Sequence, residues 1–247
     1  HAAVLALAAL LVAAIAAPAP AITIGFWSGG GRTWNNSPDF SNIKSLMTAS
    51  GHIVEADEAM TADALADNQM WLIGAAASVP GDAEMTALST WVHAGGTLLV
   101  LADGGGTGVA SGNTILPGIG SHMVFSVTNE SEETAPLAGG IFATEGPPSI
   151  VGQNLLTSPS AAVSGGTVLA GSASRSYIEY EALGFGYVFA FGDRSDHDAK
   201  LTSGDVNGKL FLNLAAGSRG IIPEPLTALG LMAGIGGLAG YLRRRRR

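Results

Sequence analysis

Two uninterrupted apolar runs constrain the fold of this chain more than any other feature. They are Met70–Gly74 (MWLIG) and Thr97–Ala102 (TLLVLA), whose one polar residue is the initial Thr97, and neither shows the alternation of a strand with one solvent-exposed face. Such runs are typical of strands in a parallel sheet that is covered on both faces. Between them, a helical apolar pattern begins after Pro80 and includes Leu88 and Trp91. The segment therefore predicts a strand–helix–strand unit of an α/β protein.

The chain before this unit predicts a similar one. Ile22–Trp27 is a short β-rich run, and an apolar helical face follows Pro38. Gly51 is a typical helix stop, and His52–Glu55 is predicted as the next strand. The order strand, helix, strand, strand, helix, strand predicts an α/β layered fold with a mainly parallel sheet.

The second half of the chain is predicted to contain less helix. Residues 129–166 are rich in Pro, Gly, Ser and Thr, which predicts loops or an inserted excursion. Period and composition predict strands at 123–128, 167–170, 177–180 and 186–191, of which the last two form a hairpin, and a closing helix over 207–216.

The N-terminal residues 1–21 predict a secretory signal peptide with a helical apolar core. Ala2–Ala17 is apolar but too short for a comfortable membrane span, and Pro18 and Pro20 follow it. Small residues flank both prolines at the spacing that a signal peptidase requires. The alternative is an apolar helix buried in the protein.

The C-terminal residues 221–247 have three parts. Pro223, Glu224 and Pro225 form a rigid polar tripeptide, and residues 226–242 are uncharged. At about 1.5 Å per residue, this uncharged stretch has roughly the minimum length for a transmembrane helix. The last five residues are all arginine, which favours the cytoplasmic side of a membrane: Arg243, Arg244, Arg245, Arg246 and Arg247. The segment predicts an inner-membrane anchor with the body outside the cytoplasm.

These three parts, in this order, resemble the PEP-CTERM sorting signal. The resemblance implies a Gram-negative bacterium that makes extracellular polysaccharide. It also implies an exosortase, a membrane cysteine protease, which recognises Pro223-Glu224-Pro225 and removes the tail. The processed protein would then reach the outer envelope, the cell surface or the extracellular matrix. The alternative is an unrelated tail anchor, since apolar spans flanked by arginine are common.

The charge and the cysteine content exclude several classes of function. Removing the five terminal arginines and Glu224 from 12 basic and 20 acidic residues leaves 7 and 19, a net charge of −12. A body this acidic repels nucleic acid. The chain has no cysteine, which excludes disulfides, thiolate metal sites and a cysteine nucleophile.

The body, residues 22–220, resembles the class I glutamine amidotransferase-like fold, which has a flavodoxin-like sheet. The stretches that carry the resemblance are Ala87–Asp103, Gly184–Asp193 and the helix containing Phe211-Leu212-Asn213. More narrowly, the body is similar to bacterial domains of that fold with no assigned activity. Amidotransferases place a cysteine on the turn after the strand that matches 97–102, where this chain has Asp103-Gly104-Gly105. The chemistry of the family is therefore not implied.

Three loops are candidates for a ligand site, because ligands of open α/β sheets lie beyond the carboxyl ends of the strands. They span residues 28–33, 103–108 and 193–198. The first could hold an anion on its backbone amides, with a cation beside them, but a plain glycine turn is the alternative. The residues of this candidate site are Gly29, Gly30, Gly31 and Arg32.

The other two loops contain the acidic candidates. Asp103 could act as a general base, or could cap backbone amides at the end of its strand. Asp193, Asp196 and Asp198, with His197 among them, could bind calcium outside the cell, or could form a solvated polar loop. Glu179 and Glu181 alternate to one face of a strand; they are a glycosidase pair only with the right separation, and a solvated strand face is the favoured interpretation.

These observations favour an exported, non-catalytic protein whose body is a binding or structural module. One alternative is an extracellular hydrolase acting on carbohydrate or ester through Asp103, Asp193 and His197. The other is a calcium-dependent adhesion module; calcium is the one cofactor candidate. The expected partners are signal peptidase, exosortase and the membrane, with extracellular polysaccharide as a further candidate.

Overall fold

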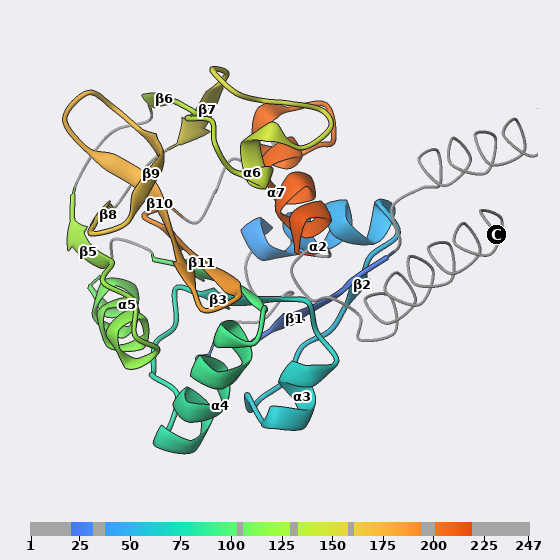
Figure 1. The fold of residues 1–247 in the computed structure, drawn as a ribbon, viewed down its shortest axis with the longest axis vertical. Coiled ribbons are helices and arrows are strands. Elements are labelled where there is room, and N and C mark those ends of the chain that lie inside the picture. Colours follow the sequence, from blue (N-terminus) through green and yellow to red (C-terminus); the bar gives the residue numbers. More distant parts are fainter. Residues whose placement is uncertain are drawn as a thin grey trace, which may run out of the picture.

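One mixed β-sheet organises the molecule in the computed structural model (Figure 1). The structure describes residues 21–31, 38–102, 106–128, 133–157, 161–193 and 201–218. The predicted signal segment up to residue 20 and the predicted sorting segment 221–247 lie outside these ranges. None of the helices within the described ranges combines the length and the apolar character needed to span a bilayer, and the predicted span 226–242 is not among them.

Five neighbouring strands of the sheet are parallel. In spatial order they are β2 (Ile53–Val54), β1 (Thr23–Phe26), β3 (Met70–Gly74), β4 (Thr97–Leu101) and β11 (Gly186–Phe191). All residues of β3 and β4 are buried, as their continuous apolar runs predict. The α/β class is confirmed.

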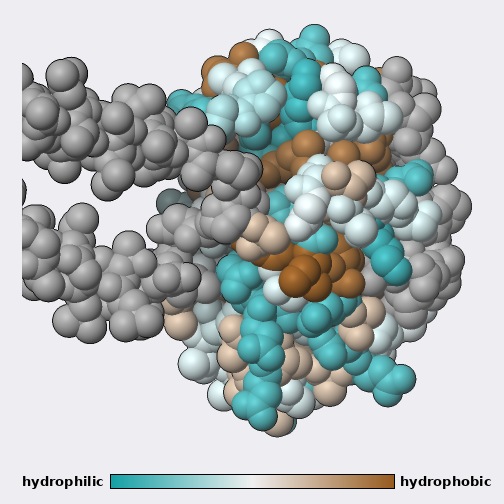
Figure 2. Space-filling view, turned by 90° about the vertical axis from the view of Figure 1, so that its right-hand side faces the viewer, coloured by the Kyte–Doolittle hydropathy of each residue, from teal (hydrophilic) through white to brown (hydrophobic). Residues whose placement is uncertain are grey.

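The sheet continues beyond β11 with antiparallel strands. β10 (Ser176–Leu183) pairs with β11 as the predicted hairpin, and its other side pairs with both β9 (Thr167–Gly171) and β8 (Ala161–Ser164). β5 (Val124–Val127) pairs with β8 and forms the far edge. Figure 2 shows the molecule from the side of the other sheet edge, where β2 lies. Hydrophobic side chains gather at the centre of this view.

Helices cover both faces of the sheet, so the molecule has two apolar cores. One face carries α2 (Pro38–Ala49), α6 (Phe142–Glu145) and α7 (Val206–Gly217), and the other carries α3 (Ala62–Ala66), α4 (Asp82–His93) and α5 (Thr107–Gly118). The alternation within β3 shows the division, since Met70 and Leu72 belong to the first core and Trp71 and Ile73 to the second.

Helix α5 was not expected from the sequence. Its residues include Gly108, Ser111 and Gly112, which are poor helix formers and suggest a loop. All three are buried, and a Cβ on Gly112 would lie 2.6 Å from the ring of Phe125. Close packing against β5 therefore stabilises a helix that local propensity does not favour.

Residues 129–166 were predicted as loops or an inserted excursion, and the described part of this region contains regular helix and strand. This region contains β6 (Glu133–Pro136), α6, β7 (Asn154–Thr157) and β8. β6 and β7 pair with each other in a separate two-stranded sheet. The part from β6 to β7 leaves the main sheet, and its apolar residues pack into the core under α7, whereas β8 belongs to the main sheet.

Candidate functional site

The loops predicted to share one edge of the sheet do follow parallel strands. Residues 28–31 come after β1, residue 106 onward comes after β4, and Gly192-Asp193 comes after β11. Five of the candidate residues in these three loops lie outside the described ranges, and their roles stay predictions: Arg32, Asp103, Asp196, His197 and Asp198.

The glycine-rich loop after β1 is a turn that is fastened to its neighbours. The amide of Gly31 donates to the carbonyl of Ser28 at 3.1 Å, and Gly31 has a positive φ of 82°. The amide of Ala77 donates to Gly30 O at 2.8 Å, and Ser78 Oγ donates to Gly29 O at 3.2 Å. The loop after β3 therefore holds the carbonyls of the loop after β1.

The loop after β2 is fastened to the same turn. Both the amide and the hydroxyl of Ser28 donate to the carbonyl of Asp57, at 2.8 and 2.9 Å. The indole of Trp27 donates to Glu58 O at 3.1 Å, and Gly29 and Gly30 lie against its ring. At this edge of the sheet, the backbones of three successive loops bind one another.

Asp193 is buried rather than presented to solvent. Its side chain accepts a hydrogen bond from Thr157 Oγ1 at 2.8 Å, and the residue is only 6% exposed. The contact joins the end of β11 to β7. Among the residues that the structure describes, no three His, Asp or Glu side chains lie close enough together to hold a metal ion.

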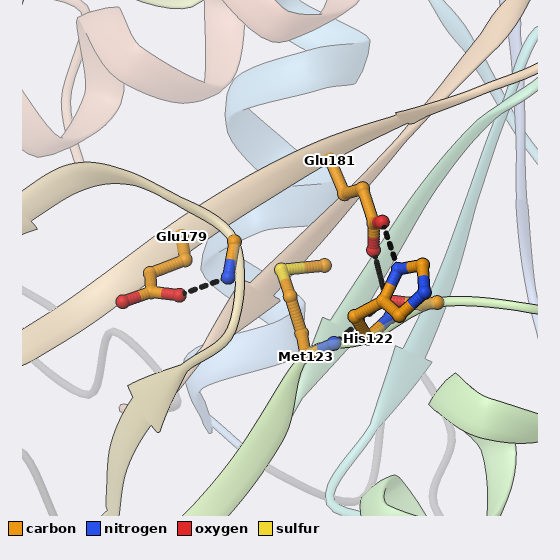
Figure 3. Close-up of polar contacts among 6 residues, drawn as sticks. His122, Met123, Glu179 and Glu181 are labelled. Carbon is orange, nitrogen blue, oxygen red and sulfur yellow. Dashed lines mark hydrogen bonds and ion pairs between the residues drawn. The ribbon is translucent and has the colours of Figure 1, made fainter.

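The two glutamates of β10 point to one side of the sheet but differ in environment (Figure 3). Glu179 is 4% exposed and accepts a hydrogen bond from the amide of Gly166 at 2.7 Å. The favoured interpretation of a solvated strand face is therefore wrong for Glu179. The side chain of Met123 lies between the two carboxylates.

Glu181 is the centre of a small polar cluster before β5. Its Oε2 accepts from Ser121 Oγ at 2.8 Å and from the amide of His122 at 2.9 Å. Its Oε1 lies 2.6 Å from His122 Nδ1, which must carry the proton because a carboxylate only accepts. The cluster links the segment before β5 directly to β10.

The cluster also favours the ionised form of Glu181. Burial raises the pKa of the Glu181 carboxyl, but the hydrogen bonds from His122 and Ser121 outweigh this effect and hold the pKa below its ordinary value. The side chain of His122 is 81% exposed, so the imidazole faces solvent beyond its contact with the carboxylate. Sequence reasoning found no partner for His122, because Glu181 lies 59 positions away.

Two further histidines in the described ranges each contact a backbone group. His93, in the last turn of α4, donates from Nδ1 to the carbonyl of Ser89 at 2.8 Å, as a helix-ending histidine can. His52 is buried, and its Nδ1 lies 3.4 Å from the amide of Ile22.

The comparisons with known proteins describe the fold and no activity. No protein-family model matches the sequence, and no curated protein does either. Among solved structures, the N-terminal domain of mmIFT52 is similar with a TM-score of 0.58 and 16% identity, over 76% of this chain and 93% of that one.

Two further structures give the same picture. The cytoplasmic protein STM1381 from Salmonella typhimurium LT2 has a TM-score of 0.53 and 14% identity, over 81% of this chain and 99% of its own. A β-galactosidase from Bacillus circulans sp. alkalophilus has a TM-score of 0.51 and 11% identity, over 82% of this chain and 32% of the enzyme. The chain therefore spans about a third of that enzyme, and likeness at such identities concerns the fold alone.

Proposed function

We propose that this chain is an exported cell-envelope protein, sorted through its C-terminal segment, with a non-catalytic binding or structural body. The order of three features in residues 223–247 carries the proposal: the Pro-Glu-Pro tripeptide, the uncharged span and the five arginines. An exosortase would cleave near the tripeptide after the span has stopped in the inner membrane. The body would then be released to the outer envelope, the cell surface or a polysaccharide matrix.

The architecture of the body is consistent with a scaffold of the flavodoxin-like kind. The parallel strands β2-β1-β3-β4-β11 have the spatial order 2-1-3-4-5 when numbered along the chain, which is the flavodoxin-like order. The amidotransferase-like variant of this fold would need a nucleophilic cysteine, and the sequence has none. The body would therefore use this fold without amidotransferase chemistry.

The use of the described carboxylates also favours a non-catalytic body. Asp193 and Glu179 are buried and bound by Thr157 and by the amide of Gly166. Each joins two segments of the fold, which is a structural role for a buried carboxylate. A hydrolytic acid–base pair would instead need two carboxyl groups that face a common substrate site.

The test is the intact mass of the protein in each compartment of its native host. Wild-type protein from the outer envelope or medium should end near residues 223–225, without the arginines. Glu224→Ala should leave the tail in place and keep the chain in the inner membrane, whereas the matched variant Thr227→Ala should be processed. A wild-type chain that still ends at Arg247 in the inner membrane would refute the sorting proposal.

A further inference from the structure

A preformed apolar groove runs between α3 and α4, which lie side by side (Figure 1). It has a volume of about 370 Å³, within the range of ligand-binding clefts. Small side chains dominate its walls; the lining includes Ala62, Ala66, Ala87, Thr90, Trp91 and Ala94. Bulky side chains from outside could therefore enter between the two helices.

The walls of this α3–α4 groove are held in place from within. Trp91 is only 9% exposed, and its indole donates to the carbonyl of Asn68 at 3.1 Å. Glu84 binds both the amide of Met60 at 3.0 Å and the amide of Gly81 at 2.9 Å, which joins the segment before α3 to the start of α4. A partner would therefore meet a groove that needs little reorganisation on binding.

The charge around the groove has one sign. The chain has no Lys or Arg between Lys44 and Arg175, so neither α3 nor α4 carries one. Asp63 and Asp67 are four positions apart and exposed, and they follow the groove residues Ala62 and Ala66 by one position each. Exposed carboxylates thus lie on α3 and at its C-terminal end, on the helix that forms one wall of the groove.

This combination selects the class of occupant. A second copy of the chain that docks through the same groove would bring two surfaces without Lys or Arg against each other, and like charges disfavour such a contact. Anionic lipid and nucleic acid are repelled for the same reason. An amphipathic helix with a basic face can place its apolar side chains in the groove and its cations beside the carboxylates.

We infer that the α3–α4 groove binds an amphipathic, basic helical segment of a partner protein. The inference rests on the proposed non-catalytic role of the body, and it names the kind of partner that the body would hold. It does not depend on how the tail is processed, since the groove residues and residues 223–247 are separate parts of the chain.

The test uses a fluorescent synthetic helix of leucine and lysine as the probe. Its binding to the full chain in nanodiscs of neutral lipid is followed by fluorescence anisotropy, with empty nanodiscs as background. Ala66→Arg fills the groove and adds a charge, and Ala49→Arg makes the same change at another exposed alanine that ends a helix, α2. The wild type and Ala49→Arg should bind alike, and Ala66→Arg should bind about tenfold more weakly, as expected at a central contact.

Two results would overturn the inference. One is equal weakening by Ala66→Arg and Ala49→Arg, which would mean that only net charge matters. The other is equal affinity for a probe of the same composition whose leucines and lysines are shuffled out of helical period. If Ala66→Arg does not fold by circular dichroism, Asp63→Asn with Asp67→Asn takes its place and should weaken binding at low salt. Failure of the groove test leaves the tail measurement intact, so the two proposals fail separately.

Discussion

The cluster around Glu181 gives a prediction with two distinct magnitudes. Glu181→Gln keeps an acceptor oxygen but removes the charge that receives three hydrogen bonds, from Ser121 Oγ and from Nδ1 and the amide of His122. Bonds to a charged group contribute about 1 kcal/mol more than neutral ones, and the exposed imidazole contributes least. We expect Glu181→Gln to lower the free energy of unfolding by about 1–2 kcal/mol at neutral pH.

The variant His122→Ala should cost much less. It removes one bond, from a side chain that is 81% exposed, and leaves the backbone amide and Ser121 in place. Pairs of this exposure contribute about 0.2–1 kcal/mol. The expected order of the two variants therefore separates the contribution of the Glu181 charge, with its bonds from Ser121 and the His122 amide, from that of the exposed imidazole.

The pH dependence follows from the lowered pKa of Glu181. Its pKa in the folded state lies below the ordinary value of 4.5, so the unfolded chain binds the proton more readily. The stabilisation is therefore complete above that ordinary value and is lost as the pH falls through the folded-state pKa. The difference in unfolding free energy between wild type and Glu181→Gln should shrink in the same direction.

Urea unfolding of both variants and the wild type, from neutral pH to about pH 3, measures these quantities. A difference between wild type and Glu181→Gln that stays constant across this range would refute the reasoning. So would a His122→Ala variant that is less stable than Glu181→Gln.

Two further predictions concern the core. Phe211 of α7 is 1% exposed and stacks on Phe191 with ring centroids 5.8 Å apart, so Phe211→Ala should cost about 3–5 kcal/mol in urea unfolding, and a cost below about 1 kcal/mol would contradict this packing. A Cβ on Gly186 would lie 2.2 Å from Val92 O and 2.3 Å from Gly96 O, so Gly186→Ala should lower the free energy of unfolding by about 3 kcal/mol or more. The control is Gly204→Ala, because the nearest atom to its Cβ would be Thr202 Oγ1 at 3.7 Å, and it should change the free energy of unfolding by less than about 0.5 kcal/mol.

The parallel half of the fold was predictable because its signals are local. Each residue of Met70–Gly74 is apolar and buried, and the same holds for the β4 residues after Thr97, a polar residue that is also buried. The helical face of Phe40, Ile43 and Met47 has the period of its helix, and all three are fully buried in α2. Periodicity decides such elements whatever packs against them.

The elements that were missed depend on partners far away in the chain. Ser111 and Gly112 suggest a loop, yet Ser111 Oγ donates to Ala76 O, 35 positions away, and Gly112 lies against Phe125. The alternation of Glu179 and Glu181 suggests a solvent-exposed strand face, yet Glu179 is buried and accepts a hydrogen bond from the amide of Gly166. Sequence patterns report the local preference of a segment, and tertiary packing overrides it at both places.

The candidate site shows the same limit in a different way. Strand order correctly indicated that the loops after β1 and β11 belong to one edge of the sheet. It did not indicate that Gly30 O would be bound by Ala77, or that Asp193 would be bound by Thr157. The sequence shows which carboxylates follow the parallel strands and so lie near one edge of the sheet. Whether solvent or a ligand can reach each carboxylate depends on the segments that fold over it.

Two features that favour binding, the crevice of the parallel sheet and an open apolar surface, therefore lie in different regions of the described surface. In open α/β sheets the ligand crevice lies at the point where the connections after two neighbouring strands run to opposite sides. Here that point is between β1, which connects to β2, and β3, which connects to β4. The carbonyls of Gly29 and Gly30 at that point already accept bonds from the loop after β3. The α3–α4 groove, by contrast, is open and apolar, and the exposed carboxylates of Asp63 and Asp67 lie on and next to α3. A partner gains more binding free energy from an open apolar groove than from carbonyls that already accept hydrogen bonds within the protein. Substitutions in α3 and α4 should therefore affect partner binding more than substitutions in residues 28–31.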